Sequence, residues 1–279
     1  MMEIGVFAKT FSGPFEAVCG QVKTSGINRI QFNYACVGLP SLPQVIESSV
    51  LNSVQQKLDD YALTVEAVSG TFNMIHPDPA QREYGLTALE TIAGSCHVLN
   101  TNLITLCTGS RNPDDMWKAH PENNLPDAWY DLRQTVDRAL AIAERYNVFL
   151  GIEPETANVI NTVGKAARLL KEVNSPYLKI VFDPANLFDR EPDNVIRYRI
   201  QHGLALLGDS IMSAHAKDRS AGGKVVAAGK GLVPFPLYLE QLQGMGYTGG
   251  LIMHGLAPDE VAETQQYLRT VLSRITNTR

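Results

Sequence analysis

Four apolar stretches in the second half of the chain each lead into one polar residue of a type that binds metal ions. They are NVFLGIEPE (147–155), LKIVFDPAN (178–186), IMSAHAKD (211–218) and GGLIMHG (249–255). In a barrel of parallel strands, the ends of consecutive strands meet at one face, so residues distant in sequence converge there. The polar residues are Glu153, Asp183, His215 and His254, and successive members are 30, 32 and 39 residues apart, about one strand plus one helix.

The rest of the chain continues this alternation of short apolar runs and longer amphipathic segments. Further strands are expected at 3–8, 29–33, 64–70 and 103–108. Eight strands alternating with eight helices predict a (β/α)₈ TIM barrel, and no linker or change of composition divides residues 1–279 into more than one domain. The expected helices are 14–24, 43–62, 81–99, 126–146, 160–173, 191–207, 235–244 and 258–275.

Composition narrows the class of protein. The chain has 279 residues, 44% of them hydrophobic and 19% charged, which is ordinary for a globular protein. A net charge of -5 argues against a nucleic-acid partner, because such surfaces are usually basic. The first residues lack the pattern of a signal peptide, no apolar run has membrane length, and the four cysteines form no CxxC pair. We therefore expect a cytoplasmic protein with reduced thiols, and the sequence is compatible with a homo-oligomer.

The four polar residues at the strand ends form a mixed set of oxygen and nitrogen ligands. Two carboxylates and two imidazoles without sulfur suit Mn²⁺, Co²⁺, Zn²⁺ or Fe²⁺, and suit Mg²⁺ less well. The sequence therefore predicts one divalent metal ion as cofactor, bound by Glu153, Asp183, His215 and His254. Each of these residues taken alone is explained equally well as a helix cap or an internal hydrogen bond.

Four motifs carry a resemblance to a known family. GIEPE, IVFDPAN, SAHAKD and AAGKG (227–231) resemble the xylose isomerase-like TIM-barrel superfamily, which includes ketose 3-epimerases, hydroxypyruvate isomerase, inosose-processing enzymes and endonuclease IV. The resemblance implies a metal held by Glu, Asp, His and Glu from strands 5 to 8. The first three correspond to Glu153, Asp183 and His215, but the fourth position is His254. A second departure is Asn186, where many members carry a histidine that contacts substrate.

The departure at His254 bears on the chemistry. In ketose 3-epimerases, the two metal-bound glutamates also exchange protons with opposite faces of the sugar carbon. An imidazole nitrogen bound to metal cannot carry a proton, so His254 is either a ligand or a proton carrier at a given moment. The candidate catalytic residues are Glu153 as base, His254, and Lys217, which shares a strand face with His215 and could stabilise an enediolate oxygen or simply form a salt bridge.

Six further residues are candidates for contact with substrate. Glu155 and Asn186 follow the fifth and sixth strands, and His76 follows the third, where capping of the next helix is the alternative role. The long irregular stretch 109–127 follows the fourth strand, and loops of that length usually have a function. Within it, Arg111 could bind a phosphate or carboxylate, Trp117 could cover a sugar face, and His120 lies close by.

Whether the substrate is phosphorylated stays open. The AAGKG segment lies after the seventh strand, where many TIM barrels bind phosphate. It lacks the GxxxxGK[ST] pattern of a P-loop. A turn that leads the chain past the active site is the simpler interpretation, and the resemblance implies the same.

The leading prediction is a metal-dependent isomerase or epimerase that acts on a small sugar, sugar phosphate or related polyhydroxy carbonyl compound through an enediolate. A dehydratase or lyase on the same scaffold, with an inosose-like substrate, is the nearest alternative. A non-catalytic sugar- or metal-binding protein is another. An endonuclease IV-type function fits less well, because it needs additional histidines, one of them at the position of Asn186.

Overall fold

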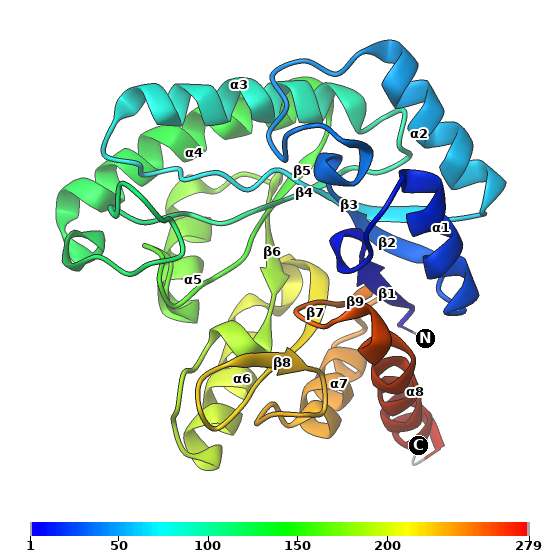
Figure 1. The fold of residues 1–279 in the computed structure, drawn as a ribbon. Coiled ribbons are helices and arrows are strands. Elements are labelled where there is room, and N and C mark those ends of the chain that lie inside the picture. Colours follow the sequence, from blue (N-terminus) through cyan, green and yellow to red (C-terminus); the bar gives the residue numbers. More distant parts are fainter. Residues whose placement is uncertain (1, 278–279) are drawn as a thin grey trace.

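The computed structural model describes residues 2–277, and within them eight parallel strands close into a barrel (Figure 1). The first six strands pair in chain order, β1 pairs with β9, β9 with β7, and β7 closes the barrel on β6. The prediction of a single-domain (β/α)₈ barrel is therefore confirmed. The barrel strands are β1 (Ile4–Phe7), β2 (Arg29–Phe32), β3 (Thr64–Ser69), β4 (Leu103–Leu106), β5 (Phe149–Ile152), β6 (Leu178–Phe182), β7 (Ile211–Arg219) and β9 (Leu251–Met253).

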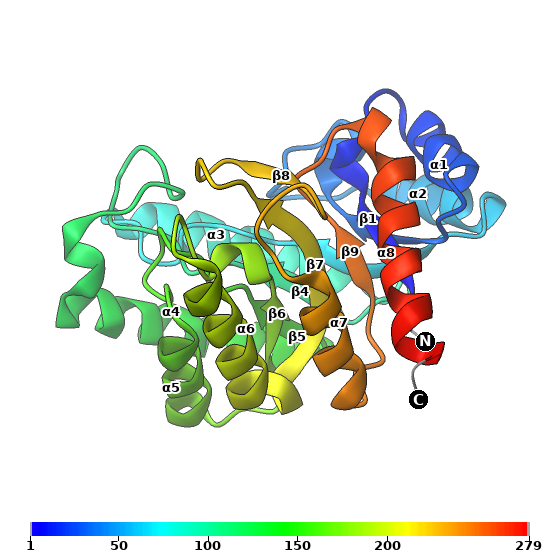
Figure 2. The same ribbon diagram turned by 90° about the horizontal axis from the view of Figure 1, so that it is seen from below.

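Within residues 2–277, eight α-helices lie outside the barrel strands. The helices are α1 (Phe15–Thr24), α2 (Ser48–Asp60), α3 (Pro79–Ser95), α4 (Pro126–Tyr146), α5 (Val163–Val173), α6 (Asp193–Leu207), α7 (Phe235–Gly244) and α8 (Val261–Asn277). Figure 2 shows helices α5 to α8 along the outside of the strands. Five of the eight helices begin one to five residues later than the sequence predicts, and for α2 and α5 the structure shows a local feature at the start. The second helix begins at Ser48 rather than at residue 43: Val45 is exposed, and Glu47 before the helix has an extended backbone conformation. The fifth begins at Val163, since the Thr162 side chain accepts the backbone N–H of Lys165 and caps the helix.

The main core lies between the strands and the helices, while the barrel interior carries a polar layer. Strand β4 is buried along its whole length, as expected for a parallel strand covered on both faces. Gln31 of β2 contacts His215 of β7, although β1 and β9 separate these strands in the sheet. Such a contact crosses the barrel interior, so these polar side chains lie inside the barrel.

A ninth strand, which the sequence reading missed, shapes the mouth of the barrel. Strand β8 (Val225–Ala227) pairs antiparallel with the end of β7, so β7 continues beyond the barrel as one arm of a hairpin. The buried carboxylate of Asp218 holds this hairpin and the AAGKG segment. It accepts four backbone N–H bonds of 2.8–3.1 Å, from Arg219, Gly229, Gly231 and Val233.

Glycine is required at one of these positions. A Cβ atom at Gly231 would lie 2.4 Å from a carboxylate oxygen of Asp218. The hairpin and its carboxylate thus fix the backbone on both sides of Lys217. Within residues 2–277, no helix has both the length and the apolar character needed to cross a membrane.

Candidate metal and substrate site

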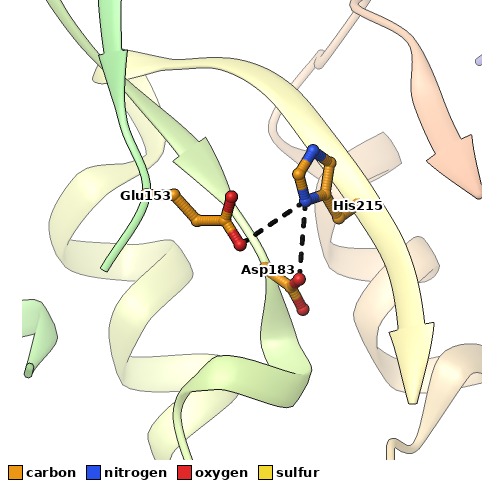
Figure 3. Close-up of side chains that lie close together, drawn as sticks. All are labelled: Glu153, Asp183 and His215. Carbon is orange, nitrogen blue, oxygen red and sulfur yellow. Dashed lines mark ion pairs between the residues drawn. The ribbon is translucent and has the colours of Figure 1, made fainter. Parts of the chain in front are cut away.

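Three of the four predicted ligands converge at the carboxyl ends of β5, β6 and β7 (Figure 3). Glu153 and Asp183 are the first residues after β5 and β6, and His215 lies within β7. Nδ1 of His215 is 3.6 Å from Oε1 of Glu153 and 3.4 Å from Oδ2 of Asp183. One ligand atom from each residue lies within 4.8 Å of the other two, which is close enough for all three to hold one metal ion.

The unused polar atoms at this point fit a cation. Oδ1 of Asp183 accepts the backbone N–H of Ala185, so only Oδ2 is directed at the cluster. Nδ1 of His215 and Oδ1 of Asn186 are buried and have no hydrogen-bond partner among the described residues, and Oδ2 of Asp183 has ionic contacts with Lys217 and His215. Buried polar atoms are rarely left unsatisfied without a functional reason. A cluster of oxygen and nitrogen atoms without hydrogen-bond partners suits a borderline divalent ion.

Lys217 supplies a positive charge to the same carboxylates. Its Nζ atom is 2.7 Å from Oδ2 of Asp183 and 3.8 Å from Oε1 of Glu153. Burial opposes the charge of the ammonium group, but Asp183, Glu153 and Glu155 outweigh burial and raise its pKa. Burial likewise opposes the charge of Asp183, yet Lys217 and His215 outweigh it and lower the pKa of this carboxyl. The cluster is thus a set of mutually stabilised charges in a buried place.

A contact on the side of the ring away from the two carboxylates holds the imidazole of His215 in one orientation. Its Nε2 atom lies 3.0 Å from Oε1 of Gln31, and a carboxamide oxygen can only accept, so Nε2 carries a hydrogen. Nδ1 therefore faces the two carboxylates. Burial lowers the pKa of His215, but Glu153 and Asp183 outweigh it and raise that pKa to about 9.

His254 lies beside the cluster but outside the group of three. Its ring stacks between Phe7, at 4.7 Å, and His215, at 5.1 Å between ring centroids. Its Nδ1 is buried without a hydrogen-bond partner in the described part of the chain. Burial, followed by the charges of His215 and Lys217, lowers the pKa of His254 well below its usual value. His254 is therefore held toward its neutral form, beside the three candidate ligands.

A cavity of about 460 Å³ opens above these residues and is lined from the carboxyl ends of the strands. Its volume lies in the usual range for a small-molecule site. Glu153, Lys217 and His254 line it, together with Lys9, which is exposed. Its neutral polar lining suits a ligand with many hydroxyl groups, and consists of Gln31, Asn33, Ser41, Ser69, Thr71 and Thr105.

A larger cavity of about 730 Å³ lies at the opposite end of the barrel, around the starts of the strands. Arg29 lines this cavity, but its guanidinium group is already paired with Glu3 and Glu66. Catalytic residues of TIM barrels lie at the carboxyl ends of the strands. We therefore assign the functional site to the smaller cavity.

The residues predicted to contact substrate divide into two groups. Glu155 and Trp117 line the cavity, and Trp117, with 54% of its surface exposed, stands at its rim. Burial raises the pKa of Glu155 and outweighs the lowering effect of Lys217. Asn186 lies at the site, but its amide donates to Oε1 of Glu153, so its direct contact is with a candidate ligand.

The other three predicted contacts are outside the cavity lining, held by internal bonds. The guanidinium of Arg111 donates to the carbonyl of Ile75 and pairs with Asp131 at 2.7 Å. His76 uses one ring nitrogen against the carbonyl of Pro113 and accepts the Asp78 N–H with the other. His120 caps the short 3-10 helix Pro121–Asn124 with its Nδ1 atom. These side chains organise the loop 109–127 rather than line the cavity.

The phosphate site considered for AAGKG is filled by the protein itself. The backbone N–H groups of Gly229 and Gly231 already bind the Asp218 carboxylate. They are thus not free to bind a phosphate, which agrees with the simpler interpretation of this segment as a structured turn.

Two buried amides that the sequence reading did not single out also shape the site. Gln31 orients His215, and Asn158 anchors the long loop by accepting the Gly109 N–H at 2.7 Å and donating to the carbonyl of Met116. The only sequence signal for Gln31 is its place between Ile30 and Phe32 in RIQFN. Alternate residues of a strand face opposite sides, so Gln31 faces the side opposite to these two apolar residues.

Comparisons with known proteins agree with this architecture. The family model described as xylose isomerase-like TIM barrel matches residues 20–271, so the chain belongs to that family. Among solved structures, 3-keto-D-glucoside 4-epimerase YcjR of Escherichia coli is similar, at 18% identity and a TM-score of 0.76, covering 97% of this chain and 100% of that one. A xylose isomerase-like TIM-barrel protein of Mycobacterium smegmatis in complex with magnesium is 18% identical with a TM-score of 0.71, covering 95% and 90%.

Curated sequences give a shorter match. L-ribulose-5-phosphate 3-epimerase UlaE of Escherichia coli is 27% identical over 147 residues, which are 51% of this chain and 50% of the relative. The chain thus spans about half the length of the curated relatives it matches. These relatives include sugar epimerases, and the solved structures establish the shared fold.

Proposed function

We propose that this chain is a divalent-metal-dependent epimerase or isomerase of a small polyhydroxy carbonyl compound. The observation that carries the proposal is the group of Glu153, Asp183 and His215, whose ligand atoms lie within 4.8 Å of one another beside a cavity lined with hydroxyl and amide groups. The names of the similar proteins, which include epimerases of a ketose phosphate and of a keto-glucoside, support the same class.

The three-residue group is proposed to hold the metal ion, with His254 outside the inner shell. When bound, a divalent cation supplies Lewis acidity that polarises a carbonyl and an adjacent hydroxyl and so acidifies the C–H bond between them. Mn²⁺, Co²⁺, Zn²⁺ and Fe²⁺ remain the expected ions from the ligand types. The magnesium complex of the mycobacterial relative makes Mg²⁺ an ion to include in every assay.

Glu153 is proposed to remove the proton from the substrate carbon. Its Oε1 atom is oriented by the Asn186 amide, and its side chain lines the cavity. A carboxylate held in place next to the acidified C–H bond is a suitable general base. The Lys217 ammonium lies in the same cavity wall and would stabilise the negative oxygen of the resulting enediolate.

His254 is proposed to be the second proton carrier. Epimerisation requires a proton to return to the opposite face of the carbon, and His254 is a neutral imidazole in the cavity wall. It would take up that proton from solvent in the cavity, and because its pKa is lowered it would release the proton readily to the carbon, while Glu153 would return the abstracted proton to solvent. Glu155 and Trp117 would then contact the hydroxyl groups and one face of the substrate.

Glu155 also favours one second candidate, a dehydratase. Its pKa is raised by burial, so this carboxyl group keeps its proton at a higher pH than usual. Glu155 lines the cavity, where its carboxyl group could donate a proton to a departing hydroxyl, which would leave as water. The same enediolate would then lose water instead of being reprotonated.

One assay separates these outcomes. The purified protein, loaded in turn with Mn²⁺, Co²⁺, Zn²⁺, Fe²⁺ or Mg²⁺, is incubated in D₂O with a panel of ketoses, ketose phosphates and inososes. An epimerase or isomerase gives a product of unchanged composition with deuterium at the carbon next to the carbonyl, whereas a dehydratase gives a product lighter by one water. Absence of any turnover with every metal and substrate would count against both, and would leave a non-catalytic binding protein.

A further inference from the structure

We propose that Gln31 is a positioning residue that selects which nitrogen of His215 faces the metal. The inference rests on the proposed metal binding and adds a determinant on the opposite side of the barrel. Gln31 belongs to β2 and His215 to β7, so their contact crosses the barrel interior. Both side chains are buried, with 3% and 1% of their surfaces exposed.

The orientation of the Gln31 amide decides the tautomer of His215. With Oε1 of Gln31 toward the ring, Nε2 must carry hydrogen, and Nδ1 is left to offer its lone pair to a cation. With the amide reversed, its NH₂ group would face Nε2, which would then have to accept. The hydrogen would lie on Nδ1, directed at Glu153 and Asp183, and would block metal coordination.

Two hydroxyl groups are the partners of the amide nitrogen in the first orientation. Nε2 of Gln31 donates to Oγ of Ser69 at 3.1 Å and lies 3.5 Å from Oγ1 of Thr105. These residues are on β3 and β4 and are themselves buried. In this arrangement the hydroxyl groups accept on the side of the amide away from His215, and the amide oxygen is directed at the ring. Contacts among residues of the neighbouring strands β2, β3 and β4 thus determine which nitrogen of His215, on β7, faces the metal site.

The choice of an amide also affects the charge at the site. Metal-binding histidines generally donate their other N–H to a carboxylate, a carbonyl or water, and a carboxylate raises the basicity of the ligand. A neutral amide orients the ring without adding a third negative charge to Glu153 and Asp183. We infer that Gln31 keeps the bound cation a stronger Lewis acid than a glutamate at the same position would.

The test compares three buried-glutamine variants of the full chain. Gln31→Met removes the acceptor at nearly constant volume, and Gln31→Glu keeps an acceptor and adds a charge. Gln265→Met is the matched control, since Gln265 is also buried and its amide bonds only the distant carbonyl of Gly26. Mn²⁺ affinity is measured by calorimetric titration, and circular dichroism and thermal melting confirm that each variant is folded.

We expect Gln31→Met to weaken Mn²⁺ binding by about 10- to 100-fold, and Gln265→Met to leave it unchanged. Gln31→Glu should bind at least as tightly as the wild type yet turn over more slowly. In metal-free protein at a pH where imidazole is neutral, ¹⁵N NMR should show His215 with hydrogen on Nε2 in the wild type and in Gln31→Glu, and a mixture of tautomers in Gln31→Met.

Two outcomes would overturn the inference, and they are distinguishable. Unchanged Mn²⁺ affinity in folded Gln31→Met, with normal binding by the wild type, would remove Gln31 from this role and leave the metal site intact. A wild type that binds none of the divalent ions would instead remove the proposed metal-dependent function, and this inference with it.

Discussion

Replacement of Lys217 by methionine should make the stability of the protein depend on metal. In the structure, the Lys217 ammonium shares the carboxylates of Asp183 and Glu153, at 2.7 and 3.8 Å, that are proposed to bind the cation. The side chains of Lys217, Asp183 and Glu153 are only 10%, 0% and 13% exposed. Water therefore screens these charges poorly, and loss of the ammonium leaves the buried Asp183 carboxylate without its nearer positive partner, since His215 is 3.4 Å away.

The expected loss of stability in Lys217→Met follows from the burial of these three side chains. Removal of one partner from a buried ion pair costs about 3–5 kcal/mol, and for a large domain each kcal/mol lowers the melting temperature by roughly 2–4 °C. Metal-free Lys217→Met should therefore melt about 6–20 °C below the metal-free wild type. Saturating Mn²⁺ should recover most of that difference, because the ion replaces the missing positive charge between the same oxygens.

Differential scanning calorimetry with and without Mn²⁺ measures both effects. Lys230→Met is the control, because Lys230 also contacts two carboxylates, Glu260 and Glu263, but is 40% exposed. Exposed pairs contribute about 0–1 kcal/mol, so this variant should melt close to the wild type. The reasoning is refuted if metal-free Lys217→Met is as stable as the wild type, or if Mn²⁺ stabilises both proteins equally.

Three further variants test other parts of the site. Glu153→Gln should abolish turnover and deuterium exchange in a folded protein, because an amide cannot accept the proton; exchange at the wild-type rate would remove Glu153 as the base. His254→Ala should reduce kcat by about 10²- to 10⁴-fold while changing Mn²⁺ affinity little, since His254 lies outside the group of three ligands; strongly weakened binding in a titration would make His254 a ligand instead. Asp218→Asn should lower the free energy of unfolding by about 2–3 kcal/mol, because part of its four charge-assisted bonds to the backbone is lost; a urea denaturation midpoint equal to that of the wild type would contradict this, with exposed Glu240→Gln as control.

The sequence was sufficient to predict the barrel, because the pattern of a short apolar run followed by an amphipathic segment occurs eight times. Each occurrence predicts one strand and one helix. Residues such as Glu153 and Asp183 stand directly after apolar runs, so their convergence follows from strand order alone. The same argument placed His254 beside them but could not determine its distance from the cluster. That distance depends on how its ring packs between Phe7 and His215.

Roles that depend on cross-barrel contacts were the hardest to predict. Gln31 and His215 are 184 residues apart, and no local pattern links them. The loop residues Arg111 and His76 have the chemistry of ligand-binding groups, yet the structure uses them to hold the loop itself. Strand β8 was missed because three residues next to a glycine-rich segment carry too little periodicity to separate a strand from a turn.

The most direct test of the proposed centre is an anomalous difference map from crystals grown with Mn²⁺. We predict one strong peak per chain, bonded to a carboxylate oxygen of Glu153, to Oδ2 of Asp183 and to Nδ1 of His215, with Lys217 displaced from Asp183 and His254 not bonded to the ion. A map without a peak among these three residues, or with the ion bound elsewhere in the barrel, would contradict the account.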